Sequence, residues 1–115
     1  MRNFRNWEMY INSKVLVKEV YILTADFPDS EKFGLISQLR RAAVSISANI
    51  AEGAGRQTDK DFRNFLFIAL GSAFEVEALI DLSIDLDYMK KESQLGLLDR
   101  MNHVQKQLNS FIKKL

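Results

Sequence analysis

Cysteine is absent from the chain, and histidine, tryptophan and proline occur once each. Without cysteine there can be no disulfide, no thiolate metal site and no cysteine nucleophile. No apolar run approaches the roughly 18 residues that span a bilayer, and residues 1–8 lack the apolar core of a signal peptide. We therefore expect a cytoplasmic protein that does not associate with membranes.

Neither sign of charge is in large excess, because the net charge of the 115 residues is only +1. The overall charge therefore does not indicate a nucleic-acid binder, and such a surface would have to arise from local clustering or from symmetry. With 47% hydrophobic and 27% charged residues the composition is that of a globular protein. We expect one domain over residues 1–115.

The few proline and glycine residues interrupt a pattern that is helical throughout, and no strand-like alternation occurs. Pro28 ends one helical segment, Gly53 and Gly55 end the next, and Thr58 has the position of an N-cap, with Asp61 three residues later. We predict helices over residues 4–26, 30–54, 59–87 and 92–114. Short connections favour an all-α, antiparallel up-down-up-down four-helix bundle.

The second predicted helix has two different faces. One is an apolar seam at steps of three and four, made by Ile36, Leu39, Ala43, Ile46 and Ile50. The opposite face has mostly short hydrogen-bonding side chains: Gln38, Arg41, Ser45, Asn49, Glu52 and Arg56. Short polar side chains among alanines suit close contact with another helix, so this face predicts assembly.

The third predicted helix contains a six-residue apolar run at 65–70. Its first half is therefore apolar on nearly all sides, which is typical of a helix that is buried all round. Since each helix of a four-helix bundle keeps one face outward, we expect something else to cover this one.

The acidic residues of the third helix do not form a metal site. Glu77, Asp81 and Asp85 recur at steps of four, but a di-metal bundle also needs a Glu-x-x-His motif. The single histidine, His103, has Arg100 three residues before it. We expect no metal and no cofactor, and we interpret the acidic stripe as a solvated or interfacial face.

Nucleophilic catalysis is equally unsupported. Ser45, Ser47 and Ser72 lie within predicted helices, without the strand-turn elbow that exposes a catalytic serine. The glycines at 53 and 55 follow a helix and lack the lysine of a phosphate-binding loop. We therefore expect a protein that is not an enzyme.

Glu75 lies one turn after Gly71 and Ser72, whose small side chains would allow close helix approach. A carboxylate buried there without a partner would be costly. One hypothesis is that Glu75 pairs with Arg41 or Arg40, within the bundle or across subunits. The alternative is that Glu75 is simply exposed.

Basic residues supply the candidates for nucleic-acid contact, because Lys and Arg neutralise phosphates without sequence preference. The candidates are Arg2, Arg5, Lys14, Lys18, Arg40, Arg41, Arg56, Lys60 and Arg63. The alternative is solvated helix faces that form ion pairs. In a ring of several chains the same patch would recur, which favours binding.

Several short motifs together resemble one family. They are QLRRA at 38–42, SI at 45–46, NIAEG at 49–53, FL at 65–66, GS at 71–72, and single residues including Tyr21, Thr24, Ala69, Glu75 and Glu77. The chain resembles the bacterial four-helix bundle proteins encoded in intervening sequences of large-subunit (23S) rRNA genes, which are often labelled ribosomal proteins.

The resemblance implies an antiparallel bundle that assembles as a pentameric ring. The related accessory protein of diversity-generating retroelements is such a pentamer and works with a reverse transcriptase and nucleic acid. Carried onto this chain, the family pattern implies structural and assembly roles, not catalytic ones, for Arg41, Ser45, Asn49, Glu52, Gly71, Ser72 and Glu75.

From the residues and the resemblance together we expect a non-enzymatic homo-oligomer, with a pentamer favoured. It would bind RNA or DNA, or help a nucleic-acid enzyme such as a reverse transcriptase to do so. The alternative is a protein-interaction scaffold that uses the acidic stripe to bind a basic partner and makes no nucleic-acid contact.

Overall fold

The chain folds into four α-helices in the computed structural model, which describes residues 2–115 apart from the side chain of Ser93. None of these residues forms a strand, so the all-helical prediction is confirmed. The helices are α1 (Glu8–Thr24), α2 (Leu35–Ala54), α3 (Asp59–Asp85) and α4 (Leu95–Lys113), with short 3₁₀ helices at Phe4–Asn6, Asp29–Glu31 and Glu92–Gln94.

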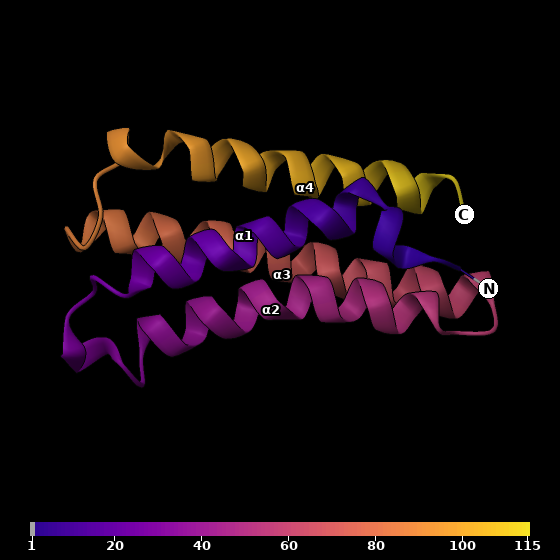
Figure 1. The fold of residues 1–115 in the computed structure, drawn as a ribbon, viewed down its shortest axis with the longest axis horizontal. Coiled ribbons are helices and arrows are strands. Elements are labelled where there is room, and N and C mark those ends of the chain that lie inside the picture. Colours follow the sequence, from indigo (N-terminus) through magenta and orange to yellow (C-terminus); the bar gives the residue numbers. More distant parts are fainter. Residues whose placement is uncertain (1) are drawn as a thin grey trace.

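The helices form an elongated body of 43 × 26 × 19 Å. Figure 1 shows both chain ends and the α2–α3 turn at one end of this body, and the α1–α2 and α3–α4 connections at the other. We call these the termini end and the loop end. Helix α1 packs against α2 and α4, and α3 packs against the same two helices.

The apolar seam of each helix meets in a common core. Leu39, Ala43, Ile46 and Ile50 of α2 are fully buried, as their spacing predicts, while Ile36 is half-buried. In α4 the last turn inserts Ile112 into the core and leaves Phe111 at its edge.

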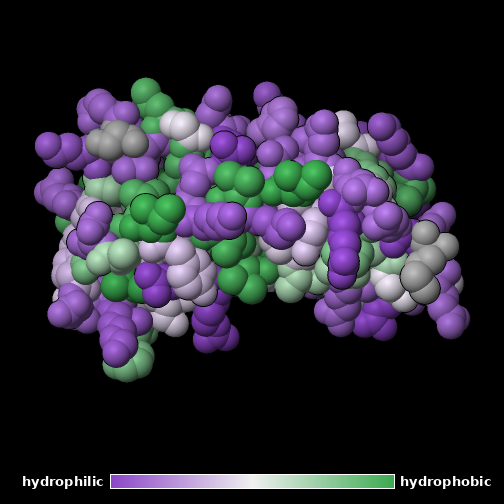
Figure 2. Space-filling view, in the orientation of Figure 1, coloured by the Kyte–Doolittle hydropathy of each residue, from purple (hydrophilic) through white to green (hydrophobic). Residues whose placement is uncertain are grey.

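Figure 2 shows that one long face of the molecule is largely hydrophilic, with hydrophobic patches near its middle.

The starts of the first two helices differ from the prediction. Helix α1 begins at Glu8 and not at residue 4, and α2 begins at Leu35 and not at residue 30. Gly34, at φ −109° and ψ −113°, breaks the helical path just before α2. The carboxylate of Glu31 then accepts the backbone N–H of Leu35 at 3.1 Å, which satisfies one of the free donors of the first turn.

Both ends of α3 are closed by local hydrogen bonds. The hydroxyl of Thr58 accepts the backbone N–H of Asp61 at 3.1 Å, which confirms the N-cap. Beyond the last turn, Asp87 has a positive φ of 62°, and the N–H of Tyr88 donates back to the carbonyl of Ser83 at 2.9 Å. This 6→1 bond is typical of a helix that ends in a left-handed residue.

The apolar run of α3 is buried on one side only in the single chain, so the cover that we expect over its outer side stays a prediction. Leu66 and Ala69 are fully buried, whereas Phe67 and Ile68 are 50% and 52% exposed. The reason is geometric: residues 66 and 69 face α2 and α4, and 67 and 68 lie about 100° and 200° further round the helix. Among the described residues, no helix is long and apolar enough to cross a membrane.

Candidate assembly face and nucleic-acid interface

A second apolar stripe runs along the outer side of α3. Phe67, Gly71, Phe74, Ala78 and Leu82 follow one another at steps of three and four, and all five are exposed. The three large side chains are 50%, 55% and 50% exposed respectively. We call these five residues the outer stripe. A helix with two apolar stripes is suited to contacts on two sides.

A polar groove of about 480 Å³ lies between α2 and α3 beside the outer stripe. Its walls carry half of the hydrogen-bonding face predicted for the second helix, namely Gln38, Arg41 and Ser45, together with Phe33, which is 91% exposed. The lining residues are Phe33, Gly34, Ser37, Gln38, Arg41, Ala42, Ser45, Ser72 and Glu75.

Short polar side chains join α2 to α3 at the floor of this groove. The hydroxyl oxygens of Ser45 and Ser72 are hydrogen-bonded at 2.9 Å. The amide of Asn49 donates to the hydroxyl of Ser45 at 2.9 Å and to its backbone carbonyl at 2.8 Å. Three of the candidate assembly residues are therefore brought together, and they link two helices of the same chain.

Arg41 and Glu75 both line the groove and both are exposed, but among the described residues no ion pair joins them. Arg40 points elsewhere. Its Nε donates to the Thr24 hydroxyl at 2.9 Å, and its guanidinium lies 4.5 Å from the centre of the Tyr21 ring. Pairing of Glu75 with Arg40 or Arg41 within one chain is therefore wrong, while pairing across subunits stays a prediction.

The glycine at the closest helix approach is Gly53, not Gly71. A Cβ atom on Gly71 would meet nothing within 4 Å, because this residue faces outward on the outer stripe. A Cβ on Gly53 would lie 2.8 Å from the Cβ of Phe65 and 3.0 Å from a ring carbon of Phe62. Sequence reasoning assigned Gly53 to the helix end, and only the α2–α3 packing reveals its steric role.

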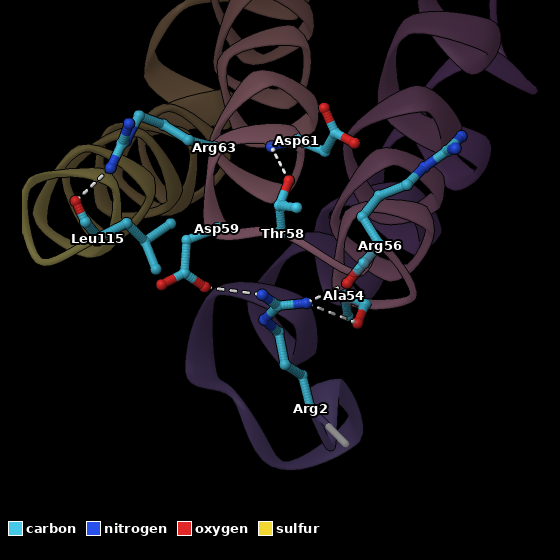
Figure 3. A network of polar contacts seen from close by, with 8 residues as sticks. All are labelled: Arg2, Ala54, Arg56, Thr58, Asp59, Asp61, Arg63 and Leu115. Atoms are coloured by element: carbon cyan, nitrogen blue, oxygen red, sulfur yellow. Dashed lines mark hydrogen bonds and ion pairs between the residues drawn. The ribbon is translucent and has the colours of Figure 1, made fainter.

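Arg2 joins the N-terminal segment to the α2–α3 turn (Figure 3). Its guanidinium pairs with the Asp59 carboxylate at 2.7 Å and donates to the backbone carbonyls of Ala54 and Arg56. The same group lies 4.6 Å from the centre of the buried Phe62 ring. Arg2 therefore stabilises the fold with most of its donors.

Two further candidate arginines are similarly occupied. Arg56 extends away from Arg2 in Figure 3, pairs with Glu52 at 3.2 Å and covers the Phe65 ring at 4.4 Å. Arg63 donates to the terminal residue Leu115 and so connects α3 to the chain end after α4. Glu52, a candidate assembly residue, thus has a partner within its own helix turn.

The remaining cationic candidates do not form one cluster. Lys14 and Lys18 lie on α1, where the Lys14 amine is 5.0 Å from the Tyr10 ring centre. Arg5 and Lys60 lie at the termini end, and Arg41 lies in the α2–α3 groove. All five are exposed.

The termini end also carries exposed lysines that the sequence analysis leaves out. They are Lys106, Lys113 and Lys114 of the last helix and its cap. These lysines can be recognised as part of the same surface only from the fold, because the end of α4 lies at the same end of the bundle as the α2–α3 turn and the start of the chain (Figure 1).

The acidic stripe is only partly solvated. Glu77 accepts a hydrogen bond from the Gln105 amide at 2.8 Å, while Asp81 and Asp85 are exposed. His103 is exposed on α4. Within residues 2–115 no group of three or more His, Cys, Asp or Glu side chains is arranged to hold a metal ion.

Tyr88, at the loop end, has a perturbed pKa. The Tyr88 hydroxyl donates to the Glu31 carboxylate at 2.9 Å. This hydrogen bond, then desolvation, then the negative charge of Glu31 raise the pKa of Tyr88 above its usual value. The contact ties the α1–α2 connection to the α3–α4 connection and is far from the basic residues of the termini end.

The chain is similar to proteins of one family over almost its whole length. A family model described as 23S rRNA-intervening sequence protein matches residues 5–110. A crystal structure of a protein with unknown function from the S23 ribosomal protein family of Bacteroides thetaiotaomicron has a TM-score of 0.84 and 30% identity, over 91% of this chain and 95% of that one. No curated protein matches the chain.

Proposed function

Because the chain belongs to the 23S rRNA-intervening sequence protein family, we propose that it acts without catalysis, as a homo-oligomer that contacts nucleic acid. Each copy is an up-down-up-down antiparallel bundle. Five copies are favoured by the resemblance to pentameric relatives. In this proposal the assembly binds RNA or DNA, or holds it for an enzyme such as a reverse transcriptase.

The outer stripe of α3 is the observation that carries the assembly part. Two phenylalanines and a leucine, each about half exposed, lie in register with Gly71 and Ala78. Burial of such aromatic side chains is a strong driving force for association. The small residues between them would let a second helix approach closely, and Arg41 and Glu75 flank the same contact from the groove.

Light scattering at micromolar concentration tests assembly. The matched variants are Phe74→Gln, within the outer stripe, and Ile22→Gln, which removes an apolar side chain that is 73% exposed on α1. We expect the wild type and Ile22→Gln to be oligomeric and Phe74→Gln to dissociate. A monomeric wild type would refute assembly, and equal behaviour of the two variants would refute the outer stripe as the contact.

Exposed cations support the nucleic-acid part. Arg41, Lys60, Arg5, Lys14 and Lys18 keep accessible charges, and an oligomer would repeat each of them in every copy. When several copies contact the same nucleic acid, the number of phosphate contacts in one complex increases. The binding constant therefore falls steeply as the salt concentration rises. A titration with structured and single-stranded RNA at two salt concentrations tests this, and lack of binding at low salt would refute it.

The second candidate function is a protein-interaction scaffold without nucleic-acid contact. Asp81 and Asp85 support it, because they are exposed on α3 and could bind a basic partner. Pull-down after nuclease treatment separates the two functions. A partner that is retained after nuclease treatment supports the scaffold, and one that is lost supports the nucleic-acid assembly.

A further inference from the structure

The charges of the bundle are separated along its long axis, although the net charge is close to zero. The termini end consists of residues 2–15, 46–71 and 105–115, and it carries nine Lys and Arg against four Asp and Glu, a net charge of +5. The loop end, residues 16–45 and 72–104, carries seven against eleven, a net charge of −4. The fold produces this separation by bringing three distant segments to the termini end and two to the loop end.

Ion pairs within the termini end leave its net charge unchanged and involve two of its arginines. Asp59 and Glu52, two of its four acids, are paired with Arg2 and Arg56. The lysines at this end stay exposed, and in the described part of the chain none of them is in an ion pair. Lys60, Lys113 and Lys114 therefore present accessible cations on the same end as Arg5.

We propose that the termini end is the surface that binds the phosphate backbone of nucleic acid, with Lys113 and Lys114 among its phosphate contacts, and that the loop end faces away. This inference rests on the proposed function and assigns it to one end of the molecule. The end is up to 26 Å wide. A duplex has one phosphate per about 1.7 Å of axis with both strands counted, so a stretch of this width carries about fifteen phosphates, of which only part face the protein.

Oligomer symmetry would multiply the effect. Where the bundles run along a cyclic axis, rotation places the termini ends of all copies on the same side of the assembly, so the positive ends add and the negative ends add separately. The loop end would repel a polyanion by the same long-range field. Together the two ends orient the nucleic acid without any base contact.

A lipid surface fits this end less well. Membrane-binding surfaces combine cations with exposed apolar side chains that enter the interface. Within the bounds of this end the large exposed hydrophobic residues are Ile11, Phe67 and Ile68, which lie on α1 and α3 away from the chain ends and the α2–α3 turn, and segments 2–10, 51–66 and 106–115 have none. The cations of the termini end therefore match phosphates that approach from water.

Two pairs of adjacent lysines give a matched test. The variant Lys113→Gln/Lys114→Gln removes two charges from the termini end, and Lys90→Gln/Lys91→Gln removes two from the loop end. All four side chains are exposed, and both variants change the net charge equally. Any difference between them reports position and not total charge.

The measurement is fluorescence anisotropy of a labelled DNA duplex and a structured RNA, between about 50 and 200 mM salt. For the duplex we expect the first variant to reduce the slope of log K against log salt by about 1.8 for each contacting chain, and the second to leave it unchanged. Thermal melting and light scattering check that both variants fold and assemble like the wild type.

The outcomes separate this inference from the proposed function. Equal loss of slope in both variants, or greater loss in the loop-end variant, would overturn the assignment while nucleic-acid binding stands. A wild type that binds neither probe at about 50 mM salt would overturn both. Binding of anionic phosphatidylserine vesicles in place of the nucleic acids would also overturn both.

Discussion

Substitution of Gly53 by alanine tests the packing of α2 on α3. The added methyl group would lie 2.8 Å from the Cβ of Phe65, whereas ordinary van der Waals contacts begin at 3.4 Å. The helices must therefore separate locally by about 0.6 Å, the difference between these two distances. The Cβ of Phe65 is attached directly to the α3 backbone, so no side-chain rotation relieves the contact.

Two opposing terms set the magnitude. Replacing glycine by alanine inside a helix stabilises it by up to about 1 kcal/mol, less near an end. An extra methyl group in a packed region costs about 1–3 kcal/mol. For Gly53→Ala we therefore expect a net loss of unfolding free energy of about 1 kcal/mol, with the steric cost exceeding the gain in helix propensity.

Gly71→Ala is the matched control, because nothing lies within 4 Å of the added methyl group. We expect it to raise the unfolding free energy of the single chain by about 1 kcal/mol. Urea unfolding followed by far-UV circular dichroism measures the unfolding free energy of both variants. Light scattering at the same protein concentration gives their oligomeric state. Equal stabilisation by the two substitutions would refute the close approach at Gly53.

Three other predictions concern helix ends. Thr58→Ala should lower the unfolding free energy by about 1 kcal/mol, measured by urea unfolding, because the N-cap bond is lost; an unchanged midpoint would contradict this. Asp87→Gly should raise it by up to about 1 kcal/mol, since glycine adopts the left-handed conformation without strain; a lower midpoint would count against it. Tyr88→Phe removes the bond to Glu31. Because the pKa of Tyr88 is raised in the folded state, the stabilisation by this residue is present below about pH 10 and is lost as the pH rises through the raised value. The difference in urea midpoint between wild type and Tyr88→Phe should shrink at alkaline pH, and a constant difference would exclude this linkage.

The helices could be predicted from sequence because their apolar seams are regular. Leu39, Ala43, Ile46 and Ile50 repeat at helical spacing, and burial in the core follows directly from that repeat. The start of α2 could not be predicted in the same way. It depends on the backbone conformation of Gly34 and on the hydrogen bond from the N–H of Leu35 to the Glu31 carboxylate. These local contacts separate a short 3₁₀ helix at Asp29–Glu31 from the α-helix that begins at Leu35.

The candidate sites were less predictable, because exposure is a property of the whole fold. The hydrogen-bonding face of α2 could be predicted from residue spacing, and Arg41 does line a groove with Ser45. The sequence did not show that Arg40 reaches back to Thr24 on α1. Nor did it show that Gly71 faces outward, because a glycine has no side chain whose hydropathy indicates a direction.

Arginine and lysine differ here for a chemical reason. A helix leaves its last carbonyl groups without partners, and a guanidinium has five donors that can satisfy several of them at once. Arg2 does this for the carbonyl of Ala54, the last residue of α2, and also binds the carbonyl of Arg56 in the turn that follows. A lysine amine is a compact, strongly hydrated charge that gains less from such sites, and Lys60, Lys113 and Lys114 remain exposed. Arg2, Arg56 and Arg63, which suggest a phosphate surface in the sequence, thus bond within the fold, and the exposed lysines of the same end are the residues that we propose as phosphate contacts.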